Sequence, residues 1–303
     1  MLMRQTEERY ISLLTDFGFK RIFGTKPNKS LLIDFLNSLF DGEQVIKDVT
    51  YRDSEHVGDV YAERKAIFDV YCENEHGEKF IVEMQNAYQT YFKDRSLYYA
   101  TFPIREQAAK GSVWDFNLKH VYVVALLNYD MKDPAFSPET INHDVGLLDK
   151  HTHQVFNDKL TFKYVEISRF DKNINQLESN FDKWLYVLRN LSRLDKQPLT
   201  LQNEVFDRLF KEAEIAKFTK TELREYEDSL KAYRDLKNSL DSAELKGLER
   251  GLEKGRAEGR AEGRAEGRAE GRAEVARKLI SMGMAIEDVM KATGLTAKEI
   301  DII

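Results

Sequence analysis

The sequence is poor in the residues that stabilise secreted domains or cross membranes. Among its 303 residues Cys72 is the one cysteine, which excludes an internal disulfide framework and argues against a cysteine-based zinc site. No apolar run approaches the ~18 residues that a membrane-spanning helix requires, and the N-terminal stretch lacks the apolar segment of a signal peptide. We therefore expect a cytoplasmic protein with no membrane partner.

An excess of basic residues is also missing. The chain has 46 Lys and Arg against 52 Asp and Glu, for a net charge of −6. Residues 1–127 hold 16 basic and 19 acidic side chains, so the front of the chain is not basic either. Nucleic-acid-binding surfaces are usually basic. Composition therefore does not predict DNA binding, and any such function must rest on particular residues.

Apolar spacing in the first half predicts the order α-β-β-β-α-β. A short helix or turn is expected within residues 8–24, followed by a helix of about 12 residues with Asn28 or Ser30 as N-cap and Asp41-Gly42 as its end. The remaining predicted elements are strands at 46–53, 66–74 and 78–86, a helix at 96–110 that contains Pro103, and a buried strand at 118–129.

The second half changes from mixed structure to helix. A strand is predicted at 162–168, an amphipathic helix at 179–191, and one or two long helices within 201–240. The tetrapeptide GRAE then occurs five times in residues 255–274. We divide the chain into an α/β domain (1–170), a helical region (171–244), a repeat helix or tether (245–274) and a small helical tail (275–303) with turn signals at Gly283 and Gly294.

A predicted hairpin brings two acidic residues together. Its loop, Glu75-His76-Gly77, suits a three-residue turn whose last residue is left-handed. In that register Asn74 faces Glu78, and Asp69 lies directly opposite Glu83. Alternation then separates two faces. One face carries Ile67, Asp69, Tyr71, Ile81, Glu83 and Gln85, and the other, entirely apolar face carries Phe68, Val70, Cys72, Phe80, Val82 and Met84.

Facing carboxylates repel each other unless a cation lies between them. Asp and Glu oxygens completed by water suit Mg²⁺, which can activate water and stabilise a phosphate transition state. The alternative is a half-exposed sheet face with scattered acids. A two-residue loop would shift the register and separate Asp69 from Glu83.

The pattern D-x13-E-x-Q across a hairpin in this α-β-β-β-α-β frame resembles the PD-(D/E)XK nuclease superfamily. More narrowly, the chain is similar to the PD-(D/E)XK family transposases and Rpn recombination-promoting nucleases. The charged, repetitive C-terminal helix is also typical of that family. Five other stretches resemble it as well, namely TDFGFKRIFG (15–24), LLIDFLNSLF (31–40), FIVEMQ (80–85), RSLYYA (95–100) and VYVVALLNY (121–129).

The resemblance implies an α/β, restriction-endonuclease-like αβββαβ core with a mixed central sheet, followed by an all-helical C-terminal region. It also implies a metal-dependent DNA endonuclease acting in transposition, recombination or phage defence. Asp69 and Glu83 would bind Mg²⁺ with the main-chain carbonyl of Met84. Gln85 would stand where the superfamily more often has a lysine, and because Gln carries no charge, a slow or conditional enzyme is expected.

Several further residues are candidates for accessory or DNA-binding roles. Asp16 and Lys20 would make a supporting or phosphate contact, unless Asp16 caps a helix and Lys20 is solvated. Asp34 would lend an acid to the metal or face water. Arg95 and Tyr98, with Tyr99 beside them, suit phosphate and base contacts, although tyrosines at helical spacing also fit a core.

The repeat allows two interpretations. In a helix each GRAE position drifts by about 40° per repeat, and its like charges four residues apart repel. A partner helix could match Arg to Glu, which would give a homodimer through the C-terminal helices, or the segment is a solvated tether. The tail resembles a helix-turn-helix unit whose last helix is poorly basic. The alternative for the tail is a docking or oligomerisation module. For the whole chain, net acidity and Gln85 favour the alternative function, a non-catalytic DNA-binding or oligomerising protein that retains the fold.

Overall fold

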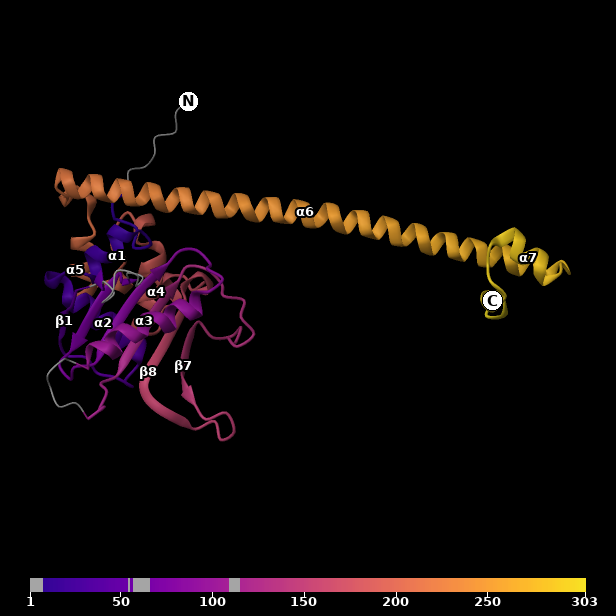
Figure 1. Cartoon of the computed structure of the whole chain (residues 1–303). Helices are drawn as coiled ribbons and strands as arrows, with labels where there is room; N and C mark the ends of the chain where they lie inside the picture. The colour runs from indigo at the N-terminus through magenta and orange to yellow at the C-terminus, as the bar shows by residue number, and fades with distance from the viewer. Residues whose placement is uncertain (1–7, 54, 57–65, 109–114) are drawn as a thin grey trace, which may run out of the picture. The chain divides into compact units, whose positions relative to one another are not determined.

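The computed structural model describes residues 8–53, 55–56, 66–108 and 115–303. The chain forms two compact units, Met1–Leu236 and Lys237–Ile303. The first unit contains a β-sheet with helices on both faces, and the second is helical (Figure 1). Within the described residues, none of the helices combines the length and the apolar character needed to span a membrane.

Two short helices open the first unit. α1 (Asp16–Phe23) begins after Thr15, whose hydroxyl accepts a hydrogen bond from the main-chain N–H of Gly18. α2 (Lys29–Phe40) has the 12 residues that its apolar spacing predicts, and it starts after Asn28. Its end is also as predicted, because Asp41 and Gly42 both have positive φ, which turns the chain out of the helix.

The central sheet is mixed, as expected, and has the strand order β1-β4-β5-β6-β8-β7. Strands β4 and β5 are antiparallel, as are β1 with β4 and β7 with β8, whereas β5, β6 and β8 run parallel. The strands are β1 (Val49–Tyr51), β4 (Val70–Asn74), β5 (Lys79–Gln85), β6 (Val121–Leu127), β7 (Asn142–Leu148) and β8 (Val155–Glu166). A separate pair joins β2 (Glu55–His56) to β3 (Ala66–Ile67). Helix α3 (Phe92–Glu106) makes the connection from β5 to β6.

Several elements of the first unit differ from their predictions. β7 was not predicted, because it is an edge strand whose side chains are mostly exposed and lack an apolar alternation. β8 begins seven residues before the predicted strand, at Val155, since its first half extends away from the core and is polar or exposed. α3 starts four residues early, at Phe92, and ends four residues early, at Glu106, so that Pro103 lies in its last turn.

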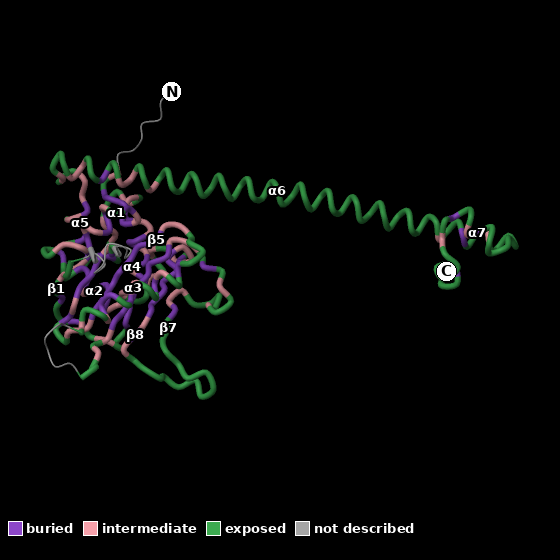
Figure 2. The backbone as a smooth tube through the Cα atoms, in the orientation of Figure 1, coloured by how far each residue is buried: buried purple, intermediate pink, exposed green. Residues whose placement is uncertain are grey.

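The two faces of the sheet have separate cores, and the buried residues lie between the layers (Figure 2). One core joins the sheet to α1, α2, α4 (Asn180–Asn190) and α5 (Glu204–Glu212), with Trp184 and Phe206 fully buried in it. The predicted boundary at residue 170 therefore does not divide the structure, because α4 and α5 complete the core that α1 and α2 begin.

The other core lies under α3 and contains Phe68 together with Tyr71 and Ile81. The sequence placed Phe68 on the opposite face. The difference arises because the strand is interrupted at Phe68 and Asp69, between β3 and β4, and the alternation of side chains restarts after the break. Cys72 lies on its predicted core face, fully buried, and burial raises the pKa of its thiol.

The second unit consists largely of one helix. α6 (Lys220–Ser281) has 62 residues and contains all five GRAE repeats, so the predicted boundaries at 244 and 274 fall inside it. The repeats are exposed and helical. After α6, α7 (Ile286–Thr293) and α8 (Ala297–Asp301) close a small core of Ala276, Val289 and Ile300. The two turn glycines predicted in the tail both have positive φ.

Candidate active site

The β4–β5 hairpin has the predicted register. Val70 pairs with Val82, and the main-chain N–H of Asn74 donates to the carbonyl of Glu78 at 3.0 Å. Gly77 ends the loop with a φ of 79°, which is the left-handed conformation that its position requires. The paired residues end at Val70 and Val82, and the same register continued by one residue would place Asp69 opposite Glu83.

Asp69 is held against β5 by its side chain. It sits at the bend before β4, where its Oδ2 accepts a hydrogen bond of 2.8 Å from the main-chain N–H of Met84. The bond occupies one carboxylate oxygen and places Asp69 beside Glu83, as predicted from the hairpin. The interruption before β4 therefore serves the site, because it turns Asp69 toward β5 at the end of the pairing.

Glu83 is buried, with 5% of its surface exposed. Its Oε2 accepts a hydrogen bond from Nε2 of Gln85 at 3.0 Å and lies 3.8 Å from a guanidinium nitrogen of Arg95. Its Oε1 is buried and has no hydrogen-bond partner among the described residues. The side-chain amide of Gln85 is thus engaged in a hydrogen bond to Glu83. One oxygen of Glu83 remains available to a ligand.

Both carboxyl groups are disfavoured as anions. Burial, followed by the charge of Asp69, raises the pKa of Glu83 to about 8. Burial also raises the pKa of Asp69, although the hydrogen bond from Met84 and the charge of Lys20 oppose this. Two desolvated carboxyl groups side by side resist losing both protons. A divalent cation removes that conflict, so the donor set fits a hard metal ion.

Arg95 approaches this pair from α3. Its guanidinium donates to Oε1 of Gln89 at 2.5 Å and lies over the rings of Phe92 and Tyr99. The prediction gave Arg95 a phosphate contact, but the structure directs it at Glu83. It holds the carboxylate in place from the helix side of the sheet.

Tyr99, and not Tyr98, shares the environment of the carboxylates. Burial raises the pKa of Tyr99, and the charge of Glu83 adds to this shift. Tyr98 is 42% exposed and packs edge-on against Phe102, with the ring centres 5.1 Å apart. Neighbouring residues on a helix point about 100° apart, so Tyr99 lies near the carboxylates, whereas the DNA contact predicted for the more exposed Tyr98 stays a prediction.

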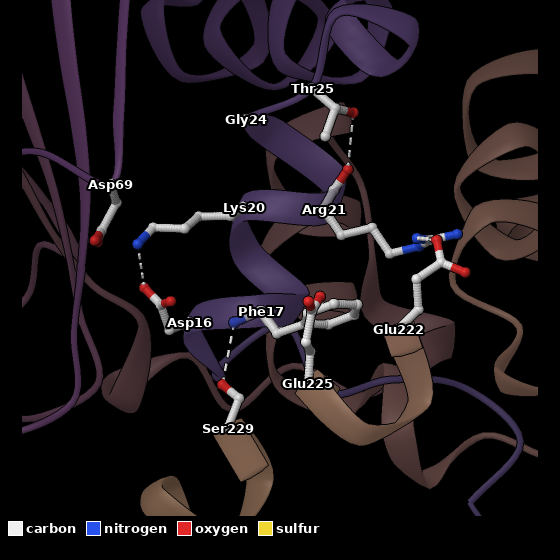
Figure 3. A pocket seen from close by; sticks show the side chains of 10 residues that line it. All are labelled: Asp16, Phe17, Lys20, Arg21, Gly24, Thr25, Asp69, Glu222, Glu225 and Ser229. Carbon is white, nitrogen blue, oxygen red and sulfur yellow. Dashed lines mark hydrogen bonds and ion pairs between the residues drawn. The ribbon is translucent and has the colours of Figure 1, made fainter. Parts of the chain in front are cut away.

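Lys20 and Asp16 line a pocket beside Asp69 (Figure 3). Nζ of Lys20 lies 2.7 Å from Oδ1 of Asp16 and extends toward Asp69. The pocket has a volume of about 630 Å³, and α1 and the first turns of α6 supply most of its other lining residues. Thr15 caps α1, so the alternative in which Asp16 is the cap is wrong, and Asp16 is instead the ion-pair partner of Lys20.

Asp34 has a structural role and not the predicted accessory one. Its Oδ2 accepts hydrogen bonds from Nδ2 of Asn180 at 2.8 Å and from Nε1 of Trp184 at 2.7 Å. These bonds connect α2 to α4 in the core. The superfamily pattern suggested a metal contact, but here the carboxylate is used to satisfy a buried indole.

Sequence reasoning missed Tyr129 and Gln89. Five buried side-chain atoms lack a hydrogen-bond partner within the described parts of the chain, and they include Glu83 Oε1, Arg95 Nε and the hydroxyl of Tyr129. Arg95 acts electrostatically on both Glu83 and Tyr129. Buried polar atoms are normally paired, so this group marks a place for water or a ligand. The one signal in the sequence was a tyrosine two residues after the end of a parallel strand.

Among the residues that the structure describes, no further acid or histidine joins the pair to form a metal-binding group. Within the described ranges, no group of three or more His, Cys, Asp or Glu residues is placed to hold one ion. Any metal here would rely on Asp69 and Glu83, with main-chain oxygen, water and substrate completing the shell.

A mixed sheet with two adjacent carboxyl groups at its central hairpin, covered by helices on both faces, defines a PD-(D/E)XK-type nuclease fold. The family model of PD-(D/E)XK nuclease family transposases matches residues 13–243. A model of the C-terminal HTH domain of the Rpn/YhgA-like nuclease family matches residues 269–303. The chain belongs to the PD-(D/E)XK nuclease family transposases. No curated protein and no solved structure matches it significantly.

Proposed function

We propose that this protein is a divalent-metal-dependent DNA endonuclease, with Mg²⁺ as the expected ion. The observation that supports this most is the pair of Asp69, which lines the pocket, and buried Glu83, whose Oε1 has no partner among the described residues. The carbonyl of Met84 is the proposed third protein ligand. The family match supports a role in transposition or recombination, with phage defence as a further possibility.

The proposed reaction is the hydrolysis of a DNA phosphodiester. The oxygen of water joins phosphorus, one P–O ester bond breaks, and the proton that water loses is balanced by one that the leaving oxygen gains from solvent. When bound, a divalent cation supplies Lewis-acid activation of water and neutralises phosphate charge. Gln85 keeps the carboxylate of Glu83 oriented through its amide, and Arg95 holds it from the other side.

DNA is the proposed partner of both units. The C-terminal HTH match supports DNA binding by the tail, although residues 275–303 carry four basic and four acidic side chains. A weak or shape-dependent contact is therefore proposed there, and not a strongly electrostatic one. A homodimer through the exposed length of α6 remains our proposal for how two sites could act on two strands.

A specific observation favours a second candidate, a non-catalytic DNA-binding or oligomerising protein that retains the fold. Gln85 is neutral and its amide is occupied by Glu83, so this position brings no positive charge to a substrate. The net charge of −6 points the same way.

Incubation of the purified chain with supercoiled plasmid DNA and Mg²⁺ or Mn²⁺ tests the proposal. We expect nicked or linear DNA from the native protein and none from Asp69→Asn, which keeps an oxygen for the Met84 N–H. Glu139→Gln, a change of equal charge at an exposed acid, is the control and should cleave normally. Equal cleavage by the native and Asp69→Asn proteins would exclude this site, and inactivity of native protein with every divalent ion would favour the second candidate.

A further inference from the structure

Gln85 brings no positive charge to the candidate site, but positively charged side chains from other elements lie close to it. Two positively charged side chains act on the carboxylates of Asp69 and Glu83, and these are Arg95 on α3 and Lys20 on α1. They differ in how many contacts within the protein hold their charged groups.

The guanidinium of Arg95 is held by several such contacts. It spans from Gln89 to Glu83, stacks between Phe92 and Tyr99, and its Nε is buried. A guanidinium fixed in this way orients the carboxylate but cannot move to meet an incoming phosphate. Arg21, which lines the pocket beside Lys20, is similarly engaged, because Glu222 and the carbonyl of Glu212 accept its hydrogen bonds.

Lys20 is differently placed. The one hydrogen-bond or ion-pair partner found for its ammonium group within the described structure is Asp16, whose side chain is 63% exposed. The ammonium reaches into the pocket that Asp69 also lines, so both groups meet the same space (Figure 3). A lysine has a flexible four-carbon stem and three donors, so it can leave an exposed partner for a ligand.

The segment that carries Lys20 is fixed to the end of β5. Nδ2 of Asn86, one residue after Gln85 and the strand, donates to the carbonyl of Leu14 at 2.7 Å. On the other side of α1, the main-chain N–H of Phe17 donates to Oγ of Ser229 at 3.1 Å. The position of Lys20 relative to the hairpin is therefore set by side chains that bond to the main chain of Leu14 and Phe17, and it does not depend on the side chain of Lys20.

We propose that Lys20 supplies, from α1, the positive charge that Gln85 does not bring, by donating a hydrogen bond to a non-bridging oxygen of the scissile phosphate. Asp16 holds the ammonium at the rim of the pocket until a phosphate arrives. This inference rests on the proposed endonuclease function and adds a residue to it. It also changes the expected role of Lys20 from general DNA attachment to stabilisation of the reacting phosphate.

The protonation state of Lys20 is consistent with this role. Burial alone would lower its pKa, but the hydrogen bond and charge of Asp16, with the charges of Asp69 and Glu83, raise the pKa above its ordinary value. The side chain is thus a permanent cation at neutral pH. It can donate hydrogen bonds and balance charge, whereas it cannot accept the proton of water.

The test compares Lys20→Met with Lys26→Met, a matched loss of charge at an exposed lysine with no ion pair found in the described structure. Single-turnover cleavage should fall about 10²-fold in Lys20→Met, since loss of one transition-state donor typically has that effect, and should not change in Lys26→Met. Affinity for DNA in Ca²⁺, where cleavage is blocked, should change by less than about threefold. Adding Gln85→Lys to Lys20→Met should restore about tenfold or more of the lost rate, because it returns a cation to the same carboxylates.

Metal affinity without DNA separates this inference from the proposed function. Removing a cation that repels the metal should tighten Mn²⁺ binding by roughly 2–10-fold in Lys20→Met, measured by calorimetry, and leave Lys26→Met unchanged. If native protein cleaves and Lys20→Met cleaves equally well, or loses DNA affinity as much as rate, Lys20 does not have this role. If native protein never cleaves, the proposed function fails. In that case the Mn²⁺ measurement still tests Lys20, because an unchanged affinity in Lys20→Met would show that Lys20 is not part of the site. Melting temperatures and Lys20→Arg, which should keep part of the activity, exclude misfolding as the cause.

Discussion

The burial of Glu83 predicts that the metal-free protein loses stability as pH rises through the neutral range. A carboxyl group with a pKa near 4.5 when unfolded and about 8 when folded favours the folded state below the unfolded value. That advantage is lost as pH rises through the folded one. Between about pH 5 and about pH 7.5 the loss is on the order of 3 kcal/mol. Glu83→Gln removes the titration and keeps the shape, so its stability should not show this loss.

Urea denaturation in EDTA measures this directly, because Trp184 is fully buried and reports on the main core. The native protein and the control Glu139→Gln should become less stable by similar amounts over this pH interval, whereas Glu83→Gln should change by about 3 kcal/mol less. Mg²⁺ at the higher pH should restore stability to the native protein and not to Glu83→Gln. A parallel pH dependence in native protein and Glu83→Gln would show that Glu83 is not the strained group and would refute the reasoning.

Three further predictions concern the scaffold. Asp34→Ala leaves the indole of Trp184 and the amide of Asn180 without their acceptor. Thermal unfolding should therefore show a loss of about 2–3 kcal/mol in the free energy of unfolding. Mn²⁺ affinity should be unchanged, and a weaker affinity would contradict the structural role. Gly77→Ala places a side chain at a φ of 79° and should lower the free energy of unfolding in urea by about 1 kcal/mol. An unchanged free energy of unfolding would show that the loop is not left-handed in solution. Gly18→Ala puts a Cβ 2.1 Å from the carbonyl oxygen of Ser12 and should lower the free energy of unfolding by more than about 3 kcal/mol in the same assay. If the Gly18→Ala protein is as stable as the native protein, the start of α1 is packed less closely than the structure shows.

Local rules were sufficient for the hairpin. The position of Gly77 determined the loop, the loop determined the register, and the register placed Asp69 opposite Glu83. They also predicted α2 with both ends, because its apolar stripe and the Asp41-Gly42 stop agree. Where short-range chemistry and the overall fold impose the same answer, sequence alone is sufficient.

Features that depend on contacts between distant segments could not be predicted in this way. The bond from Trp184 to Asp34 spans 150 residues, and nothing near Asp34 reveals that a buried indole needs its carboxylate. Similarly, the choice of Tyr99 over Tyr98 depends on the rotation of α3 against the sheet, which the spacing of apolar residues in that helix leaves open. β7 was missed because an exposed edge strand has no apolar face to produce a pattern.

The GRAE array makes the length of α6 an easily changed property. Gain or loss of one repeat changes the helix by about 6 Å in rise and about 40° in rotation. There is open space along the array, because a Cβ added at any of its glycines would meet no atom within 4 Å, and only the repeats next to the tail line a pocket with Ala292 and Thr293. The hairpin has the opposite character, since one inserted residue in its loop would move Glu83 out of register with Asp69. Duplication and deletion can therefore vary the length of α6, whereas the β4–β5 hairpin tolerates neither.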